Sequence, residues 1–301
     1  MLELYNKPFI YHLLNCSKVN SLLLLHLHGA VTFIHMTVIS LNDFSKATKT
    51  VKLPGLAALL MKVMKIDAFN HLIQRAGNLE GLAFTQYVLN FLGVTLEIDN
   101  SDLLNVPANG AFIAVANHPY GAIESLALLN LLVSCRPDTL FMGNFSLKKV
   151  PNLADYIIAV NPFENIRDSS SNSGIKTTLN KLKTGTPVAI FPAGEVAAFN
   201  FKAGKITDRQ WHPVVGKIIE KAKVPVLPIY FHGNNGIGFS LLRYLHPSLQ
   251  TAMLPAELFN KKGKCLRVRI GNPINADEIS LLSSRGNLIT DLRQRTYELS
   301  K

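Results

Sequence analysis

The sequence predicts an α/β fold in which a mixed, largely parallel sheet is covered by helices and preceded by a helical N-terminal preface. Two observations carry this prediction. After the preface, short apolar runs rich in β-branched residues alternate with segments of helical periodicity, a pattern typical of a sheet with helices on its faces. Three of the runs, AFIAVA, PVAIFP and VPVLPIYF, are apolar at nearly every position, as expected for strands buried on both faces.

The preface is expected to contain helices at 54–66 and 82–92, where apolar residues recur at three- and four-residue spacing. Either helix could pack on the core, and Leu59, Met61 and Met64 beside Lys62 are also the mixture that an interfacial helix uses. The strands and helices that follow are expected at 111–116, 122–134, 139–142, 156–160, 175–183, 188–191, 214–223, 226–231 and 266–270. Functional groups of such a fold lie in the loops at strand ends.

The domain organisation is predicted to be an N-terminal extension, 1–41, followed by one domain, 42–301, that includes the helical preface 50–95. Residues 19–42 contain no Asp, Glu, Lys or Arg and are long enough to span a bilayer. Three histidines dilute this run and Lys18 is the only basic residue close to its upstream flank, which is a poor signal-peptide pattern. A membrane anchor and a true translation start at Met36 are both open interpretations.

The amino-acid composition indicates which classes of partner the protein binds. Lys and Arg number 31 against 20 Asp and Glu, and the formal charge of +11 favours anionic partners. The charged fraction of only 17% and the mean hydropathy of +0.19 fit a membrane surface better than nucleic acid, which we do not expect as a partner. The three cysteines lie far apart without a CxxC pair, which favours neither a disulfide scaffold nor a cysteine zinc site.

One loop concentrates candidate catalytic groups. The segment NHPYGAIE, 117–124, lies between the apolar run AFIAVA and a leucine-rich helix. Glu124 falls in the first helical turn, where a carboxylate is favoured by the helix dipole, and it could accept a hydrogen bond from one ring nitrogen of His118. The other nitrogen would then be free to take a proton from a hydroxyl or amine. The alternative is that Asn117 and His118 only cap the start of the helix.

NHPYGAIE resembles the NHxxxxD block of the glycerolipid acyltransferase superfamily, the lysophosphatidate acyltransferase-like enzymes. It is more similar to the NHPxGxxD form of the bacterial hemolysin-like branch, although the carboxylate here is Glu. Further blocks follow in the expected order over about 105–274: IAVNP (158–162) with Arg167 after it resembles the acceptor block, FPAGE (191–195) resembles FPEG, and VPVLP (224–228) resembles the later proline-containing strand block.

The resemblance implies O-acyl transfer with His118 as general base and Glu124 as its orienting carboxylate, without a metal or cofactor. The acyl donor would be a thioester on acyl carrier protein or coenzyme A, with its chain in an apolar groove between the sheet and the preface helices. Backbone amides near Gly121 and Gly194 would stabilise the oxyanion. The full set of implied substrate-binding residues is Asn117, Gly121, Asn161, Arg167, Phe191, Pro192, Gly194 and Glu195.

The acceptor is expected to be a lysolipid at the cytoplasmic face of the inner membrane, with the protein peripheral or singly anchored. The branch includes enzymes that acylate lyso-ornithine and lyso-glycine lipids, and Glu195 would suit such an acceptor, unless it only pairs with a nearby Lys. Pro162 stands where the family has Arg, and Arg167, Lys202, Lys205 and Arg209 could bind an anion instead.

Two other functions stay open at this point. One is acyl transfer to lysophosphatidate in phospholipid synthesis, and the other is a non-enzymatic, hemolysin-like protein that binds membranes. His212 and His232 are expected to be structural or substrate-lining, and Trp211, the only tryptophan, either fills the core or lines an acyl tunnel.

Overall fold

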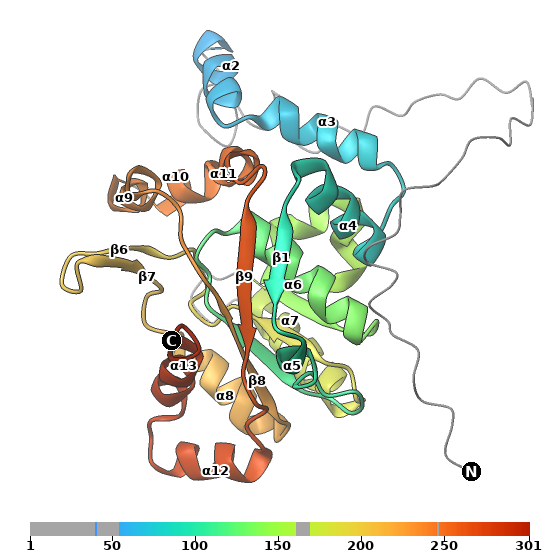
Figure 1. Ribbon diagram of the computed structural model, residues 1–301, viewed down its shortest axis with the longest axis vertical. Coiled ribbons are helices and arrows are strands. Elements are labelled where there is room, and N and C mark those ends of the chain that lie inside the picture. Colours follow the sequence, from blue (N-terminus) through green and yellow to red (C-terminus); the bar gives the residue numbers. More distant parts are fainter. Residues whose placement is uncertain (1–39, 41–53, 161–168, 246) are drawn as a thin grey trace, which may run out of the picture. The chain divides into compact units, whose positions relative to one another are not determined.

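The computed structural model describes residues 40, 54–160, 169–245 and 247–301 (Figure 1). The candidate anchor and the alternative start at Met36 lie outside the described residues, and so do Asn161, Pro162 and Arg167. The division into an extension 1–41 and a domain 42–301 stays a prediction. In the described part of the chain, no helix combines the length and the apolar character needed to cross a bilayer.

A seven-stranded sheet forms the centre of the described residues. Its strands are β1 (Thr95–Ile98), β2 (Ile113–Ala116), β3 (Leu140–Asn144), β4 (Ile157–Val160), β5 (Val188–Ile190), β8 (Val226–Phe231) and β9 (Cys265–Ile270). They are arranged in the order β1-β9-β8-β2-β5-β3-β4. All neighbouring pairs run parallel except β8 and β9, which are antiparallel. The predicted fold class, a mixed and largely parallel sheet, is confirmed.

The helices agree with the predicted ones in the sheet region and add several more. The preface contains α2 (Pro54–Val63), α3 (Ile66–Ala76) and α4 (Gly81–Leu92), followed by α5 (Asn100–Leu103), α6 (Ala122–Cys135), α7 (Ser169–Lys183) and α8 (Pro213–Ala222). The chain then forms α9 (Ile237–Leu245), α10 (Pro247–Ala252), α11 (Leu254–Asn260), α12 (Ala276–Ser284) and α13 (Leu288–Glu298). The 3₁₀ helices η2 (Phe145–Lys149) and η3 (Pro151–Tyr156) connect β3 to β4, and β6 (Ala198–Asn200) pairs with β7 (Lys205–Thr207) in a separate hairpin.

The single helix expected at 54–66 is wrong in one respect. Lys65 adopts a left-handed backbone with φ of 54°, and a residue in that conformation interrupts a right-handed helix. α2 therefore ends before it and α3 begins after it. Met61 and Met64 are buried in a small cluster with Ala57, so of the proposed interfacial residues Leu59 is the exposed one.

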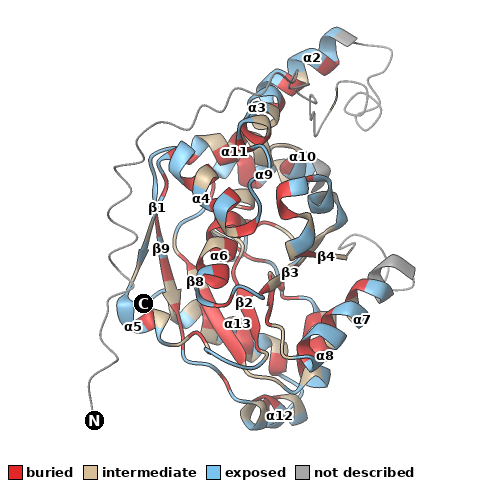
Figure 2. Ribbon diagram, turned by 90° about the vertical axis from the view of Figure 1, so that its right-hand side faces the viewer, coloured by how far each residue is buried: buried red, intermediate tan, exposed pale blue. Residues whose placement is uncertain are grey.

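The two faces of the sheet each carry a core. Along β2, Ala114 and Ala116 pack in the cluster that includes α3, α4 and α6, whereas Ile113 and Val115 pack in the cluster with α7, α8, α12 and α13. This period of two is the signature of a strand covered on both faces. Figure 2 shows the buried residues gathered in the central strands and on the inward faces of these helices.

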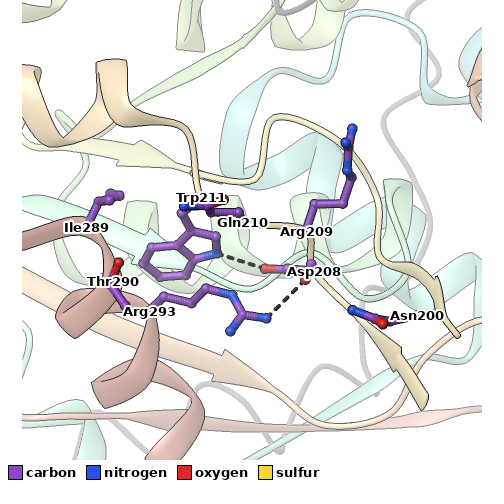
Figure 3. A pocket seen from close by; sticks show the side chains of 8 residues that line it. All are labelled: Asn200, Asp208, Arg209, Gln210, Trp211, Ile289, Thr290 and Arg293. Carbon is purple, nitrogen blue, oxygen red and sulfur yellow. Dashed lines mark hydrogen bonds between the residues drawn. The ribbon is translucent and has the colours of Figure 1, made fainter. Parts of the chain in front are cut away.

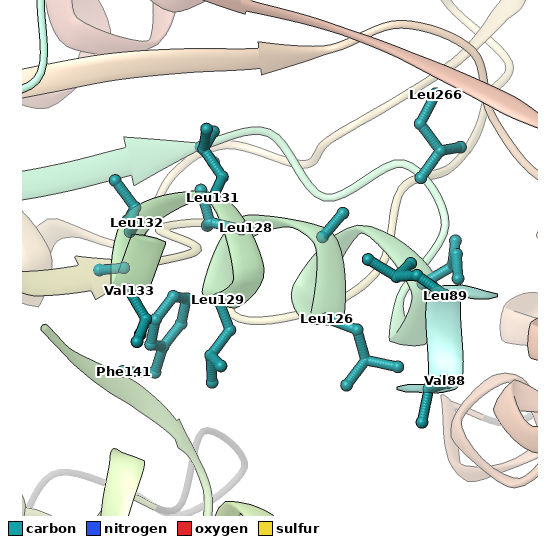
Figure 4. Packing of buried hydrophobic residues seen from close by; sticks show 14 of the residues in the cluster. Val88, Leu89, Leu126, Leu128, Leu129, Leu131, Leu132, Val133, Phe141 and Leu266 are labelled. Atoms are coloured by element: carbon teal, nitrogen blue, oxygen red, sulfur yellow. The ribbon is translucent and has the colours of Figure 1, made fainter. Parts of the chain in front are cut away.

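Among the described residues, buried side chains occupy the region between the sheet and α4, where part of the acyl groove was predicted. Leu89 of α4, Leu128 and Leu132 of α6, and Phe141 of β3 belong to one buried cluster, which Figure 4 shows in close contact around α6. Side chains packed at this density leave little space for a ligand. An acyl chain would have to displace them, so this position for the groove is not supported.

Candidate active site

Three loops meet at one edge of the sheet because three neighbouring strands run parallel. β8, β2 and β5 are adjacent, so their carboxyl ends lie side by side. The segment 117–121 follows β2, the FPAGE segment 191–195 follows β5, and 232–235 follows β8. Ligands of open α/β sheets bind at this edge. Two of the blocks that the sequence singled out are thus brought together, and a third loop that it did not single out joins them.

His118 and Glu124 are in contact. Nδ1 of His118 lies 2.9 Å from Oε1 of Glu124, and the Glu124 side chain is fully buried. The N–H direction at Nδ1 is not aligned well enough with the carboxylate for a hydrogen bond, and Nδ1 has no other hydrogen-bond partner. Such contacts are often poorly aligned before substrate binds and tighten afterwards. Because Nδ1 faces the carboxylate, Nε2 is the nitrogen available to a substrate.

Glu124 is itself held by the backbone of the loop. Its Oε1 accepts hydrogen bonds from the amides of Tyr120, at 2.8 Å, and Gly121, at 2.6 Å, while Oε2 is buried without a hydrogen-bond partner. Gly121 has φ of 98°, and a Cβ on it would lie 2.3 Å from Leu254 Cδ2. Only glycine tolerates both the conformation and the contact. The tight turn therefore positions the carboxylate beneath the imidazole.

The backbone of His118 is anchored by residues far away in the sequence. Its N–H donates to Asp208 Oδ1 at 3.0 Å, and its carbonyl accepts from the amide of Ala197 at 2.8 Å. The other oxygen of Asp208 accepts from Trp211 Nε1, and Arg293 donates to the Asp208 carbonyl (Figure 3). Burial raises the pKa of Asp208, and the hydrogen bonds from His118 and Trp211 oppose that rise.

Asp208 was missed by sequence reasoning. It lies between β7 and α8 in the run TDRQW, which carries no motif and no periodicity. A pairing across 90 residues depends on where the β6–β7 hairpin places the chain, so no local signal could have found it. Trp211 is 1% exposed and packs in the second core, so the core interpretation of this residue is confirmed, although it also lines a cavity of about 310 Å³ with Asp208 and Arg293.

Asn117 joins the loop to the neighbouring strand. Its Nδ2 donates to the Phe231 carbonyl at 2.9 Å, and its Oδ1 accepts from the Phe231 amide at 2.7 Å. Asn235, which sequence reasoning also missed, donates its Nδ2 to the Tyr120 carbonyl at 2.8 Å. The Tyr120 hydroxyl donates to the His232 carbonyl. The structure therefore places Asn117 as a support that joins β8 to the catalytic loop, with its amide facing the strand.

Phe191 of the FPAGE segment lies against His118. The two rings stack with centroids 4.1 Å apart and planes inclined by 21°. Pro192 is buried, and its carbonyl accepts from the amide of His212. This stacking fixes the plane of the imidazole from the side that the β5 loop covers. The structure therefore brings Phe191, one of the residues that the resemblance implies for substrate binding, against the histidine.

Three backbone amides of the two loops already donate hydrogen bonds within the protein. The amides of Tyr120 and Gly121 donate to Glu124, as above, and the amide of Gly194 donates to the Phe191 carbonyl at 3.0 Å. A backbone N–H supplies one donor, so each is already used. An oxyanion would therefore have to be bound by other amides of these two loops, and the expectation that amides near Gly121 and in the Gly194 loop stabilise it stays a prediction.

Glu195 is paired with two arginines. Its Oε1 accepts from Arg209 Nη1 at 2.9 Å, and its Oε2 contacts Arg243 Nη1. Arg243 lies on α9 and its side chain is 13% exposed, whereas Arg209 is exposed. The alternative in which Glu195 pairs with a basic residue holds, with arginine in place of the expected lysine. The cluster carries a net positive charge.

His212 and His232, the two other histidines that the sequence analysis considered, have structural surroundings. His212 caps α8, with its Nδ1 accepting from the amide of Val214 at 3.2 Å. Burial and the nearby cations Arg267 and Arg269 lower the pKa of His232, so it stays neutral at physiological pH. Its ring lies edge-on against Tyr230.

The fold and this geometry agree with what the chain resembles. Residues 43–301 match the model of the acyltransferase family, and the protein belongs to that family. It is an enzyme that transfers acyl groups, and the non-enzymatic alternative loses its support. The chain is 27% identical over 240 residues to the lyso-glycine lipid O-acyltransferase of Phocaeicola vulgatus, covering 76% of this chain and 83% of that protein.

A second relative carries the same name. The lyso-glycine lipid O-acyltransferase of Bacteroides thetaiotaomicron is 24% identical over 222 residues, which cover 71% of this chain and 79% of that protein. Among solved structures, the 1-acyl-sn-glycerophosphate acyltransferase of Thermotoga maritima superposes with a TM-score of 0.46 at 18% identity, over 81% of this chain and 94% of that one.

Proposed function

We propose that this acyltransferase transfers a fatty acyl group from an acyl thioester to the hydroxyl of a lysolipid, and that a lyso-glycine lipid is its acceptor. The observation that carries the proposal is the His118–Glu124 contact at the carboxyl ends of the parallel strands. The names of the two relatives favour the acceptor. Transfer of the acyl group to lysophosphatidate is the second candidate.

The chemistry follows from which nitrogen is free. The acceptor hydroxyl gives its proton to Nε2 of His118 as its oxygen attacks the thioester carbonyl. The carbon–sulfur bond then breaks, and the imidazolium returns the proton to the leaving thiolate of acyl carrier protein or coenzyme A. Glu124, with Nδ1 2.9 Å away, stabilises the imidazolium while it exists. The mechanism needs no acyl-enzyme, metal or cofactor.

The positive cluster beside the site supports an anionic acceptor. Because Glu195 is shared by Arg209 and Arg243, its carboxylate is neutralised within the chain and does not attract an amino group. A glycine headgroup linked through its amine presents a carboxylate, which suits arginine. Lysophosphatidate presents a phosphate and would be attracted by the same charges, so charge alone does not separate the two candidates.

The place of action follows from the substrate. A lysolipid and its diacyl product reside in a membrane, and the charge of +11 favours an anionic surface. We propose peripheral association with the cytoplasmic face of the inner membrane, where acyl carrier protein and coenzyme A thioesters are found.

The test is acyl transfer by purified protein from a labelled acyl thioester, on either carrier, to lyso-glycine lipid, lyso-ornithine lipid and lysophosphatidate in detergent micelles, read by mass spectrometry. His118→Ala is compared with His71→Ala, a control at an exposed histidine on α3. We expect product from lyso-glycine lipid in the wild type and the control, and none in His118→Ala. Product from lysophosphatidate alone would replace the acceptor, and full activity of His118→Ala would refute the mechanism.

A further inference from the structure

Helix α9 exposes a row of apolar residues to solvent, while its one charged residue, Arg243, and the apolar Phe239 face the protein. Four of its residues, at the spacing i, i+4, i+7 and i+8, are exposed: Ile237 60%, Leu241 37%, Tyr244 55% and Leu245 77%. Positions with this spacing share one helical face. Arg243 instead turns inward to Glu195. An ordinary surface helix has the opposite arrangement, so this face is shaped for an apolar partner.

The β6–β7 hairpin extends this apolar surface. Phe201, in its turn, is 66% exposed, and its ring centroid lies 5.1 Å from that of Tyr244. The Tyr244 hydroxyl donates to the Phe199 carbonyl, which fixes the hairpin to α9, and the two lie side by side in Figure 1. We call the surface formed by Phe201, Ile237, Leu241, Tyr244 and Leu245 the hairpin–α9 face.

Charge identifies the partner. Neither 196–207 nor 236–256 contains an Asp or Glu, whereas Lys202, Lys205 and Arg209 are exposed on and beside the hairpin. Apolar and aromatic side chains bordered by exposed cations match an anionic lipid surface, into which the apolar groups insert while the cations meet the headgroups. A protein partner of acidic surface would use the lysines, but it would not need the exposed apolar side chains of Phe201 and Leu245.

The hairpin–α9 face is directly connected to the catalytic loop. Ala197, at the start of the hairpin, donates to the His118 carbonyl, and Gln250 of α10 donates to the Ala197 carbonyl. Leu254, at the start of α11, lies against Gly121. A surface bound through these elements is therefore held close to the histidine, where a lipid acceptor has to arrive.

We propose that the hairpin–α9 face docks the enzyme onto an anionic membrane, inserting Phe201 and the exposed stripe of α9. The proposed function gives this membrane contact its purpose, but the vesicle-binding test does not depend on that function. Full-length protein is mixed with vesicles of phosphatidylethanolamine and phosphatidylglycerol, or of phosphatidylcholine alone, and the bound fraction is measured by flotation.

The test variant is Phe201→Glu with Leu245→Glu. Its matched control is Leu104→Glu with Leu281→Glu: Leu104 directly follows α5 and is 86% exposed, and Leu281 lies on α12 and is 52% exposed. Both variants change the charge equally. We expect the test variant to lower the partition coefficient on anionic vesicles by about tenfold or more, and the control to leave it nearly unchanged. Melting temperatures verify that both variants fold.

Several outcomes would overturn the proposal. One is that the test and control variants bind vesicles equally well. Another is that removal of residues 1–35 abolishes binding while the test variant binds like the wild type. A third is that binding is lost only in the variant Leu56→Glu with Leu59→Glu on α2. Unchanged vesicle binding with lost binding to acyl carrier protein would assign the face to that protein. Acyl transfer in micelles is measured separately. Transfer without vesicle binding would refute only the docking role of the hairpin–α9 face. Vesicle binding that depends on this face, without acyl transfer, would refute only the proposed function.

Discussion

Replacing Glu124 by Gln tests whether the buried carboxylate works through its charge. Gln has the same shape, and its amide oxygen can still accept from the amides of Tyr120 and Gly121. The nitrogen takes the position of Oε2, which has no hydrogen-bond partner. The variant therefore keeps the turn and removes the negative charge that faces His118.

The magnitude follows from the 2.9 Å between Nδ1 and Oε1. At an effective dielectric constant of about 20, two unit charges at that separation attract by about 6 kcal/mol, an upper figure because both charges are delocalised. If the proton is half transferred in the transition state, about half of this is lost. About 3 kcal/mol corresponds to a fall in kcat of about 100-fold, within the range for general-base catalysis.

The assay is acyl transfer in micelles, with kcat and KM measured for the wild type, Glu124→Gln and Glu124→Asp. We expect Gln to lower kcat with KM nearly unchanged, because Glu124 is fully buried and cannot contact substrate. Asp keeps the charge but is shorter by one methylene, so it loses the two backbone hydrogen bonds and lowers both kcat and the melting temperature. A kcat for Gln within about threefold of wild type would refute the electrostatic role.

Three further predictions concern the supports of the site. Asn117→Ala leaves the Phe231 amide and carbonyl without their partner and should lower the free energy of unfolding by about 2–4 kcal/mol in urea titrations. In Asp208→Asn, an NH₂ group replaces one of the two oxygens and faces either the His118 N–H or Trp211 Nε1, which are both donors. One hydrogen bond is therefore lost, and kcat and the melting temperature should both fall. An unchanged kcat would show that this anchor is dispensable. Asp102 is buried, which raises its pKa, but the Arg269 and Ile270 hydrogen bonds outweigh this and lower it below 3.8. Its ionised form therefore stabilises the fold above pH 4 and is lost on acidification, so the Asp102→Asn and wild-type melting temperatures should converge as pH falls.

The parts of the fold that could be predicted are those whose signal is local. The runs at 113–116, 188–190 and 226–231 are buried on both faces, so their sequence is apolar throughout, and the helices between them carry their own periodicity. β1 was missed because it has only four residues, two exposed and two partly buried, so its alternation of apolar and polar residues is too short to stand out. The β6–β7 hairpin was missed because its strands have three residues each.

The contact between His118 and Glu124 could be predicted for the same reason. His118 and Glu124 are six residues apart in one turn, so their contact needs no knowledge of the rest of the fold. The partners of Glu195 could not be predicted, because Arg243 is 48 residues away on a helix that the sequence did not indicate. The sequence shows that the FPAGE segment contains a carboxylate, and only the fold shows that two guanidinium groups share it.

The supports explain why the site's precision depends on elements that carry no motif. The loop that holds His118 is fixed by Asp208 after β7, by the Phe231 backbone of β8 through Asn117, and by Asn235 beyond β8. These three attachments come from different segments, so the histidine is held against displacement in several directions. A general base misplaced by about 1 Å loses much of its rate advantage. Substitutions at Asp208 and Asn235 should therefore lower kcat through the position of the loop that carries His118.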